Sequence, residues 1–137
     1  MAIYPYLALS DARAAIAFYE QAFDAELFHE VLGEDGRTII HGRISVCGDV
    51  VMLYEYDPVH DIGVLPPDKL GGASSSVRLL VPDAGTVDRF HAQAKRLGAR
   101  ITMEPGLVPW DEYYCRLVDP FGHAWAFGAA VGRESAL

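Results

Sequence analysis

Hydrophobic and polar residues follow one order of elements twice along the chain. In the first half, the apolar run at residues 3–9 predicts a β-strand, and Ser10 and Asp11 after it predict the N-cap of a helix. Apolar residues then recur at helical spacing, which predicts a helix with one apolar face that packs on a sheet. The residues of this face are Ala12, Ala15, Ile16, Tyr19 and Phe23.

The second half repeats this order. Residues 74–81 predict the strand, Asp83 predicts the helix N-cap, and Gly98 marks the end of the helix. The apolar face of this second helix consists of Val87, Phe90, Ala94 and Leu97.

Material for three further strands follows each predicted helix. Glu34-Asp35-Gly36 and Gly48-Asp49 predict hairpin turns, because glycine tolerates the positive φ angles that such turns require. The chain is therefore predicted to contain a βαβββ module twice. The further strands are expected at residues 26–32, 37–46, 50–56, 100–104, 113–118 and 123–128.

Two segments rich in proline and glycine show neither the helical spacing nor the strand alternation of apolar residues. Residues 57–73 predict a linker between the modules, and residues 104–112 predict an irregular loop inside the second module. We therefore expect a single domain. Its parts are module one at residues 1–57, the linker at 58–73, module two at 74–130 and a tail at 131–137.

Composition agrees with one domain and argues against several partners. A chain of 137 residues with 51% hydrophobic residues can bury one sizeable core. The net charge of -8 argues against nucleic acid, whose phosphates attract clustered Lys and Arg, and it favours neutral or cationic ligands. No apolar run approaches the roughly 20 residues of a membrane helix, so we expect a cytoplasmic protein with no membrane partner. Cys47 and Cys115 form no CxxC motif and predict buried or edge-strand thiols.

Three short segments carry a resemblance to a known family: residues 14–19 (AAIAFY), 23–26 (FDAE) and 119–125 (DPFGHAW). Over about residues 4–128 the chain resembles the glyoxalase and bleomycin-resistance superfamily. His41 and Trp110 add a likeness to its small bacterial branch of uncharacterised and drug-binding members. The resemblance implies an α+β protein of the vicinal oxygen chelate fold, in which two βαβββ modules form a cupped mixed sheet with the helices on its outer face.

The same resemblance bears on metal binding. In the metal-dependent members of the superfamily, four ligands come from the first, fourth, fifth and eighth strands. The matching positions here are Tyr4, Met52, Ser76 and Ala126, and none of them is a normal ligand for such a site. A catalytic divalent metal needs about three donors from His, Asp, Glu or Cys. We therefore expect a metal-independent protein without a cofactor.

Strand alternation predicts what lines the cup, because side chains two residues apart face the same way. Small residues on the eighth strand, at positions 124, 126 and 128, are expected to leave open space there. Trp110 is expected to lie over the cup like a lid, and one of two adjacent tyrosines, taken as Tyr114, should face inward. The candidate ligand-binding residues are Tyr4, Tyr6, His41, Arg43, Met52, Tyr54, Ser76, Trp110 and Tyr114.

Several of these residues have a second interpretation. The tyrosines of the first and fourth strands could fill a collapsed core, and Met52 could fill a packing gap. Trp110 suits a ligand contact or a dimer contact, and His41 suits a structural role, a ligand hydrogen bond or a general base. Asp111 and Glu112 could contact a cationic ligand, although acids in an exposed loop are expected to be solvated.

The sequence supports two functional hypotheses and a third without a ligand. In the first, a homodimer sequesters a small aromatic or peptide-like molecule in a groove between its subunits and performs no catalysis; the resemblance to bleomycin-resistance members implies an antibiotic. In the second, a metal-independent isomerase or lyase uses His41 as its base, with Arg43 or Arg78 stabilising negative charge. In the third, the protein's own side chains fill the cup, and the dimer is a scaffold that binds no ligand.

Overall fold

The computed structural model of the protein describes residues 1–131, so the predicted tail lies outside the described residues except for Val131. Two short helices occupy the predicted linker, which the sequence did not indicate. The elements in chain order are β1 (Tyr6–Leu9), α1 (Ala12–Phe23), β2 (Glu26–Leu32), β3 (Ile39–Val46), β4 (Asp49–Glu55), the 3-10 helix η1 (Pro58–His60), α2 (Pro67–Leu70), β5 (Ser76–Leu80), α3 (Ala84–Arg96), β6 (Arg100–Val108), β7 (Glu112–Val118) and β8 (Ala124–Ala130).

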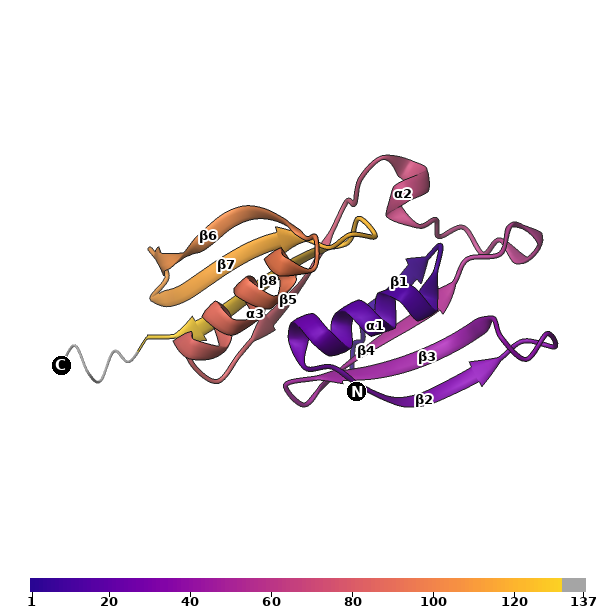
Figure 1. The fold of residues 1–137 in the computed structure, drawn as a ribbon, viewed down its shortest axis with the longest axis horizontal. Helices are drawn as coiled ribbons and strands as arrows, with labels where there is room; N and C mark the ends of the chain where they lie inside the picture. The colour runs from indigo at the N-terminus through magenta and orange to yellow at the C-terminus, as the bar shows by residue number, and fades with distance from the viewer. Residues whose placement is uncertain (132–137) are drawn as a thin grey trace.

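The strands form two four-stranded sheets of the same topology, β1-β4-β3-β2 and β5-β8-β7-β6. In each sheet the first and fourth strands of the module pair in parallel and the other neighbours pair antiparallel. Figure 1 shows the sheets side by side along the long axis of the molecule. This arrangement confirms the predicted α+β architecture of two βαβββ modules.

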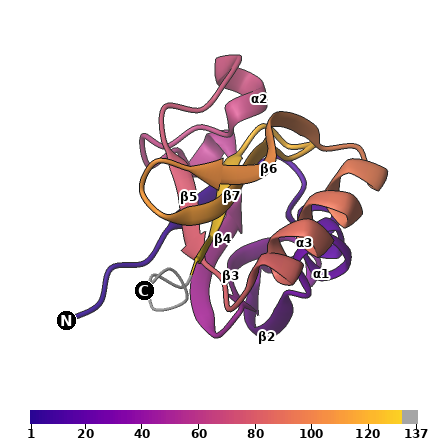
Figure 2. The same ribbon diagram turned by 90° about the vertical axis from the view of Figure 1, so that its left-hand side faces the viewer.

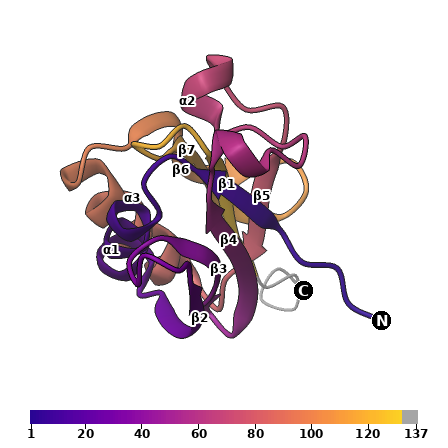
Figure 3. The same cartoon turned by 90° about the vertical axis from the view of Figure 1, so that its right-hand side faces the viewer.

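Both long helices lie on the same side of the sheets. The views along the long axis show α1 and α3 together on one side, while the N-terminal segment leaves on another (Figures 2 and 3). Asp11 caps α1 by accepting a hydrogen bond from the Ala14 N–H, and Asp83 caps α3 through Thr86. Both predicted N-caps are confirmed. No helix among residues 1–131 is long and apolar enough to cross a membrane.

The two modules share one hydrophobic core. Phe23 at the end of α1 packs against Phe90 of α3, with ring centroids 5.7 Å apart. The same ring also contacts Trp125 and Phe127 of β8, at 5.0 and 4.8 Å. A helix of module one therefore rests directly on a strand of module two.

A buried carboxylate fastens the turn between β7 and β8 to module one. Asp119, only 3% exposed, accepts hydrogen bonds from the Tyr19 hydroxyl at 2.6 Å and the Trp125 indole N–H at 2.9 Å. Its other oxygen accepts the backbone N–H groups of Phe121 and His123. The His123 ring also donates from Nε2 to the Ala8 carbonyl oxygen at 2.8 Å. The turn that carries the family signature is thus also the joint between the modules.

Several predicted boundaries were wrong. β1 begins at Tyr6, so Tyr4 lies in an extended arm before the strand. β6 continues through Pro105 and Gly106 to Val108, where an irregular loop was expected. Two register shifts against β7 accommodate this segment. Proline is tolerated there because β6 is an edge strand, and the N–H groups on the outward side of an edge strand need no partner.

Two further sequence predictions were partly wrong. The β3–β4 turn consists of Cys47 and Gly48, both at positive φ (50° and 84°), and Asp49 already belongs to β4. This pair of angles is typical of a two-residue hairpin turn. Cys115 is buried as predicted, whereas Cys47 is exposed in the turn.

Candidate functional site

The faces of the two sheets that point away from α1 and α3, here called the cup face, carry the predicted site residues. On β4, Val51 and Leu53 are fully buried on the helix side, while Met52 and Tyr54 are half-buried on the cup face. On β5, Ser76 and Arg78 are exposed, while Val77 and Leu79 are buried on the helix side. The alternation predicted for these strands is the one observed.

Strand register aligns the cup-face residues into one row in each module. In module one the row across β1, β4, β3 and β2 is Tyr6, Met52, Arg43 and His29. In module two the row across β5, β8, β7 and β6 is Arg78, Ala126, Arg116 and Met103. Arg43 and Arg116 therefore occupy equivalent positions in the two modules.

A hydrogen-bonded chain of three side chains organises the cup face of module one. The Arg43 Nε–H group donates to His41 Nε2 at 3.0 Å. Because a guanidinium has no acceptor, His41 Nε2 must accept, and the proton of the neutral ring lies on Nδ1. Nδ1 then donates to the Tyr6 hydroxyl oxygen at 2.7 Å. Both ring nitrogens of His41 are thereby engaged.

The surroundings of His41 favour its neutral form. Burial lowers the pKa of His41 below its ordinary value, and the positive charge of Arg43 and the neighbouring His29 lower it further. A neutral imidazole would suit a general base, but the lone pair of this one is occupied by Arg43. The geometry therefore favours a structural or binding role for His41.

A hollow of about 480 Å³ adjoins this cluster. It lies between the cup face of β3 and β4 and the segment after β4. The Tyr54 hydroxyl donates to the Val64 carbonyl oxygen at 3.0 Å and so holds this segment over the hollow. Most of the lining is apolar or aromatic. The lining residues are Tyr6, Thr38, Ile40, Tyr54, Glu55, Asp57, His60, Ile62 and Val64.

The cup face of module two is organised by Glu112, which was expected to be a solvated loop acid. It is instead only 8% exposed and pairs with Arg78. The same carboxylate oxygen accepts the indole N–H of Trp110 at 2.7 Å. Trp110 is 55% exposed and meets the ring of the buried Tyr114 edge-on, with centroids 5.3 Å apart. Trp110 therefore has its polar end fixed and much of its surface free.

The open space expected over β8 is not there. Ala126 is fully buried, and the ion pair of Arg78 and Glu112 lies over Gly128. A Cβ atom at position 128 would be 2.8 Å from a terminal nitrogen of Arg78 and 2.9 Å from a carboxylate oxygen of Glu112. The small residues of β8 make room for this ion pair.

Arg116 was not among the residues predicted from the sequence to bind a ligand. Its guanidinium donates to the Tyr114 hydroxyl at 2.8 Å and to the Ser76 hydroxyl at 3.1 Å. Arg78 also lies over the Tyr114 ring, 5.7 Å from its centroid. The signal that could have found Arg116 is the internal repeat, because it occupies the position of Arg43.

The structure separates the predicted site residues into two clusters. Tyr6, His41, Arg43, Met52 and Tyr54 belong to module one. Ser76, Trp110 and Tyr114 belong to module two, while Tyr4 lines a crevice of about 660 Å³ between the β1 and β5 edges, together with Tyr6, Ser76 and Arg78.

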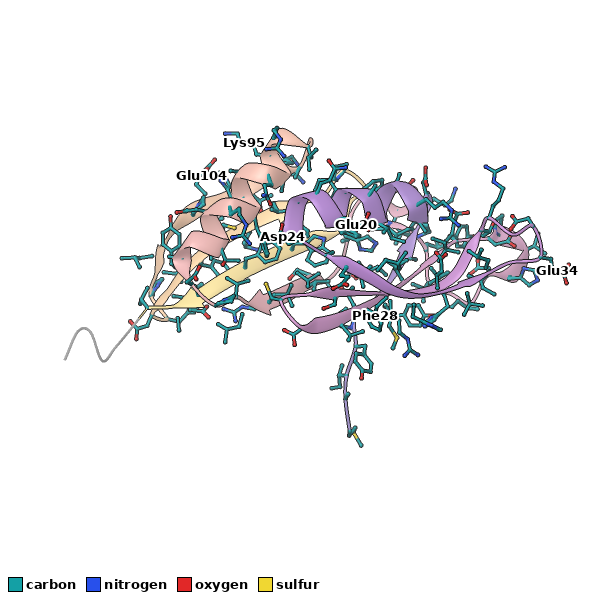
Figure 4. The ribbon with its side chains drawn as sticks, turned by 60° about the horizontal axis from the view of Figure 1, so that its bottom comes forward. Glu20, Asp24, Phe28, Glu34, Lys95 and Glu104 are labelled. Carbon is teal, nitrogen blue, oxygen red and sulfur yellow. The ribbon has the colours of Figure 1, made fainter. Side chains whose placement is uncertain are left out.

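The part of module one around Tyr54 and the part of module two around Trp110 are far apart within one chain. The β6–β7 turn, which carries Trp110, and the segment between β4 and α2 lie at opposite ends of the molecule (Figure 1). Glu34, at the β2–β3 turn, likewise lies at the far end from Glu104 of β6 (Figure 4). A single chain therefore does not bring Trp110 and Tyr54 into one groove.

Comparison with known proteins places this architecture in a family. Residues 4–127 match the model of the Glyoxalase/Bleomycin resistance protein/Dioxygenase superfamily. The chain belongs to this superfamily. Two curated relatives are 36% identical over 131 residues, which is 95% of this chain. They are the uncharacterized protein Rv0887c of Mycobacterium tuberculosis (strain ATCC 25618 / H37Rv), of which the match covers 75%, and the uncharacterized protein Mb0911c of Mycobacterium bovis, of which it covers 84%.

Solved structures of the superfamily fold are similar over nearly the whole chain. TioX from Micromonospora sp. ML1 matches with a TM-score of 0.70 and 21% identity, covering 96% of this chain and 98% of that one. Protein PA1353 from Pseudomonas aeruginosa matches with a TM-score of 0.73 and 20% identity, covering 95% and 98%. The fosfomycin resistance protein FosX from Listeria monocytogenes, in complex with Mn(II) and sulfate, matches with a TM-score of 0.67 and 16% identity, covering 98% and 93%. At these identities the likeness shows the fold.

This superfamily member lacks metal-ligand groups at the expected positions. Tyr4, Met52, Ser76 and Ala126 supply no imidazole, carboxylate or thiolate. Within residues 1–131, no group of three or more His, Cys, Asp or Glu residues is arranged to hold a metal ion. The donor set that remains on the cup face consists mainly of guanidinium and hydroxyl groups, which do not suit a divalent cation.

Proposed function

We propose that the protein binds a small aromatic or peptide-like organic molecule on its cup face without a metal ion. The observation that carries this proposal is that Tyr6, Tyr54 and Trp110 are each hydrogen-bonded at the polar end and partly exposed along the ring. Such rings are fixed before a ligand arrives, so binding costs little side-chain entropy. Their free faces suit stacking and apolar burial of a flat ligand.

The hollow beside Tyr6 and Tyr54 supports the same proposal. Its volume of about 480 Å³ falls within the range of small-molecule pockets, roughly 300–1,000 Å³. Ile40 and Ile62 supply apolar walls, and Glu55 and Asp57 are also among its lining residues. An antibiotic is a candidate ligand, since one protein with this fold is a fosfomycin resistance protein.

We further propose that a second copy completes the groove. Because Trp110 and Tyr54 lie at opposite ends of one chain, a two-fold arrangement would place module two of one copy against module one of the other. The edge strands offer apolar surface for such contacts. Exposed apolar residues are Phe28, Val31 and Leu32 on β2, and Met103 and Leu107 on β6.

Fluorescence titration tests the proposal. A panel of aromatic and peptide antibiotics would be titrated into the protein with and without EDTA, and Trp110→Phe would serve as a matched variant that retains Trp125 as a buried reference. We expect saturable quenching of wild type that EDTA does not change and that Trp110→Phe loses. Calorimetry of Trp110→Ala should then show affinity weaker by about tenfold, the loss of one stacking contact. Binding that requires added metal, or no saturable binding, would overturn the proposal.

The alternative activity, a metal-independent isomerase or lyase with His41 as base, has less support. The neutral state of His41 favours it, whereas the hydrogen bond from Arg43 to Nε2 opposes it. Product formation that His41→Ala abolishes while ligand binding persists would establish this activity in place of simple binding.

A further inference from the structure

We infer that the cup face of module two binds an oxyanion, so that the ligand of this protein carries a carboxylate, sulfonate or phosphate group beside its aromatic part. This inference rests on the proposed function and specifies the class of ligand. The proposed site, here called the arginine site, consists of Ser76, Arg78, Tyr114 and Arg116 around Ala126.

The first observation is that Arg116 is half-buried without a carboxylate partner. Its guanidinium donates hydrogen bonds to the hydroxyls of Tyr114 and Ser76, both neutral. The ion pairs within residues 1–131 do not include it. Partly buried charges in proteins are normally paired, because removing a charge from water is costly. An anionic ligand would supply the missing partner.

The second observation is the local charge. The cluster contains two guanidinium groups, on Arg78 and Arg116, and one carboxylate, that of Glu112, which pairs with Arg78; one positive charge is left in the cluster. The chain as a whole carries -8, and that acidity favours neutral or cationic ligands. Ionic screening acts over roughly 8–10 Å in physiological salt, so a group held next to these guanidiniums responds mainly to the local positive charge.

The third observation is the register of the two arginines. Arg78 and Arg116 both pair with Ala126, one from each side, in the row across β5, β8 and β7. Their Cα atoms are thus about 10 Å apart, twice the spacing between neighbouring strands. Ala126 between them is fully buried, so a bound anion would contact the solvent-exposed side of the Arg78 and Arg116 guanidiniums. Arg116 uses two of its five N–H donors in the hydrogen bonds to Tyr114 and Ser76, and a planar guanidinium fork matches an oxyanion.

Trp110 gives this site its aromatic wall. Its indole N–H and Arg78 donate to the same oxygen of Glu112, so the ring and the guanidinium are held by one carboxylate. Tyr114 lies between them, with its ring edge-on to Trp110 and its hydroxyl on Arg116. An aromatic molecule with one anionic substituent therefore fits the site: its ring meets Trp110 and its anion meets Arg116.

Two matched dyes test the inference. 8-Anilinonaphthalene-1-sulfonate carries a sulfonate, and N-phenyl-1-naphthylamine has the same ring system without it. Both would be titrated into wild type, Arg116→Gln and Arg116→Lys. The control Arg96→Gln removes one positive charge at the exposed end of α3, on the helix side of the sheets.

We expect Arg116→Gln to weaken binding of the sulfonate dye about tenfold, as for loss of one charge-assisted interaction, and to leave the neutral dye within about twofold. Arg116→Lys should recover part of the loss because it keeps the charge without the fork. Arg96→Gln should affect neither dye. Thermal melts of each variant confirm that the fold persists.

The outcomes separate this inference from the proposed function. If Arg116→Gln and Arg96→Gln weaken the sulfonate dye equally, or if Arg116→Gln weakens both dyes equally, the arginine site is wrong while the binding function stands. If neither dye binds wild type saturably, both are overturned.

Discussion

The hydroxyl of Tyr19 in α1 donates a 2.6 Å hydrogen bond to the carboxylate of Asp119 in the β7–β8 turn, 100 residues later in the chain. Neither group is accessible to solvent to a significant degree. Burial and the nearby negative charge of Asp119 raise the pKa of Tyr19 well above its ordinary value, so the hydroxyl keeps its proton at any physiological pH. At the joint between the modules, the Tyr19–Asp119 hydrogen bond is therefore a buried donor and acceptor pair, and Asp119 is also held by Trp125 and two backbone N–H groups.

Removing this joint should destabilise the whole domain. Tyr19→Phe loses one hydrogen bond to a charged group, and we expect a loss of about 2 kcal/mol in the free energy of unfolding. Asp119→Ala leaves four donors without their acceptor and should cost about 3 kcal/mol or more. Urea denaturation followed by circular dichroism measures both. The control is Tyr113→Phe, whose hydroxyl donates to exposed Asp88 at 2.6 Å; equal losses for Tyr113→Phe and Tyr19→Phe would refute a special role for the joint.

Gly122 offers a second test, of how α2 packs on the same turn. Its φ is +96°, and a Cβ atom at this position would lie 2.7 Å from Cβ of Pro67. Gly122→Ala should therefore combine backbone strain with a steric clash and cost about 2–4 kcal/mol. Gly36 is the matched control, since it also has positive φ (+69°) but no atom within 4 Å. Gly36→Ala should cost only the backbone strain of about 1 kcal/mol, and thermal melts of the two variants should differ accordingly.

The protonation of His41 provides a test by NMR. We expect the neutral ring to carry its proton on Nδ1, which nitrogen chemical shifts report directly. Arg43→Met removes one of the causes that lower the pKa of His41, while the larger one, burial, remains. The pKa should rise toward its ordinary value without reaching it, and Arg96→Met should not change it. A wild-type ring protonated on Nε2 would contradict the hydrogen bonding described here.

The lowered pKa of His41 also determines how the stability of the folded protein changes with pH. The unfolded chain binds a proton on this histidine at higher pH than the folded protein does, with an unfolded pKa of about 6.5. The contribution of neutral His41 to stability is therefore fully present above about pH 6.5 and is lost as the pH falls through that value toward the lowered folded pKa. His41→Gln should flatten this part of the stability profile.

Local patterns predicted the fold well because each depends on residues close in sequence. Each N-cap needs only an acidic side chain that accepts a hydrogen bond from the backbone N–H three residues later. Both predicted caps, Asp11 and Asp83, make this hydrogen bond. The cup-face alternation on β4 and β5 needs only the period of two along a strand. The internal repeat then assigned both modules to one architecture.

The parts of the site that were missed depend on contacts between distant residues. Glu112 looks like a loop acid until Arg78, 34 residues earlier, is placed over it. Arg116 can be assigned to the site only once its hydrogen bond to Ser76, 40 residues earlier, is known. β6 can run through Pro105 because it lies at the edge of its sheet. The order of strands in the sheet determines this position, and local composition does not reveal it.

The joint at Asp119 has a consequence for how such a protein can arise by gene duplication. The turn that matches it in module one is the two-residue turn at Cys47 and Gly48, which contains no carboxylate. The residue eight positions after the cap of α3, matching Tyr19 in α1, is His91. A chain made of two identical copies of either half would thus hold one member of the pair without the other. Starting from two identical halves, a change in one copy alone, either a carboxylate gained in its turn or a tyrosine gained in its helix, would be enough to complete the pair.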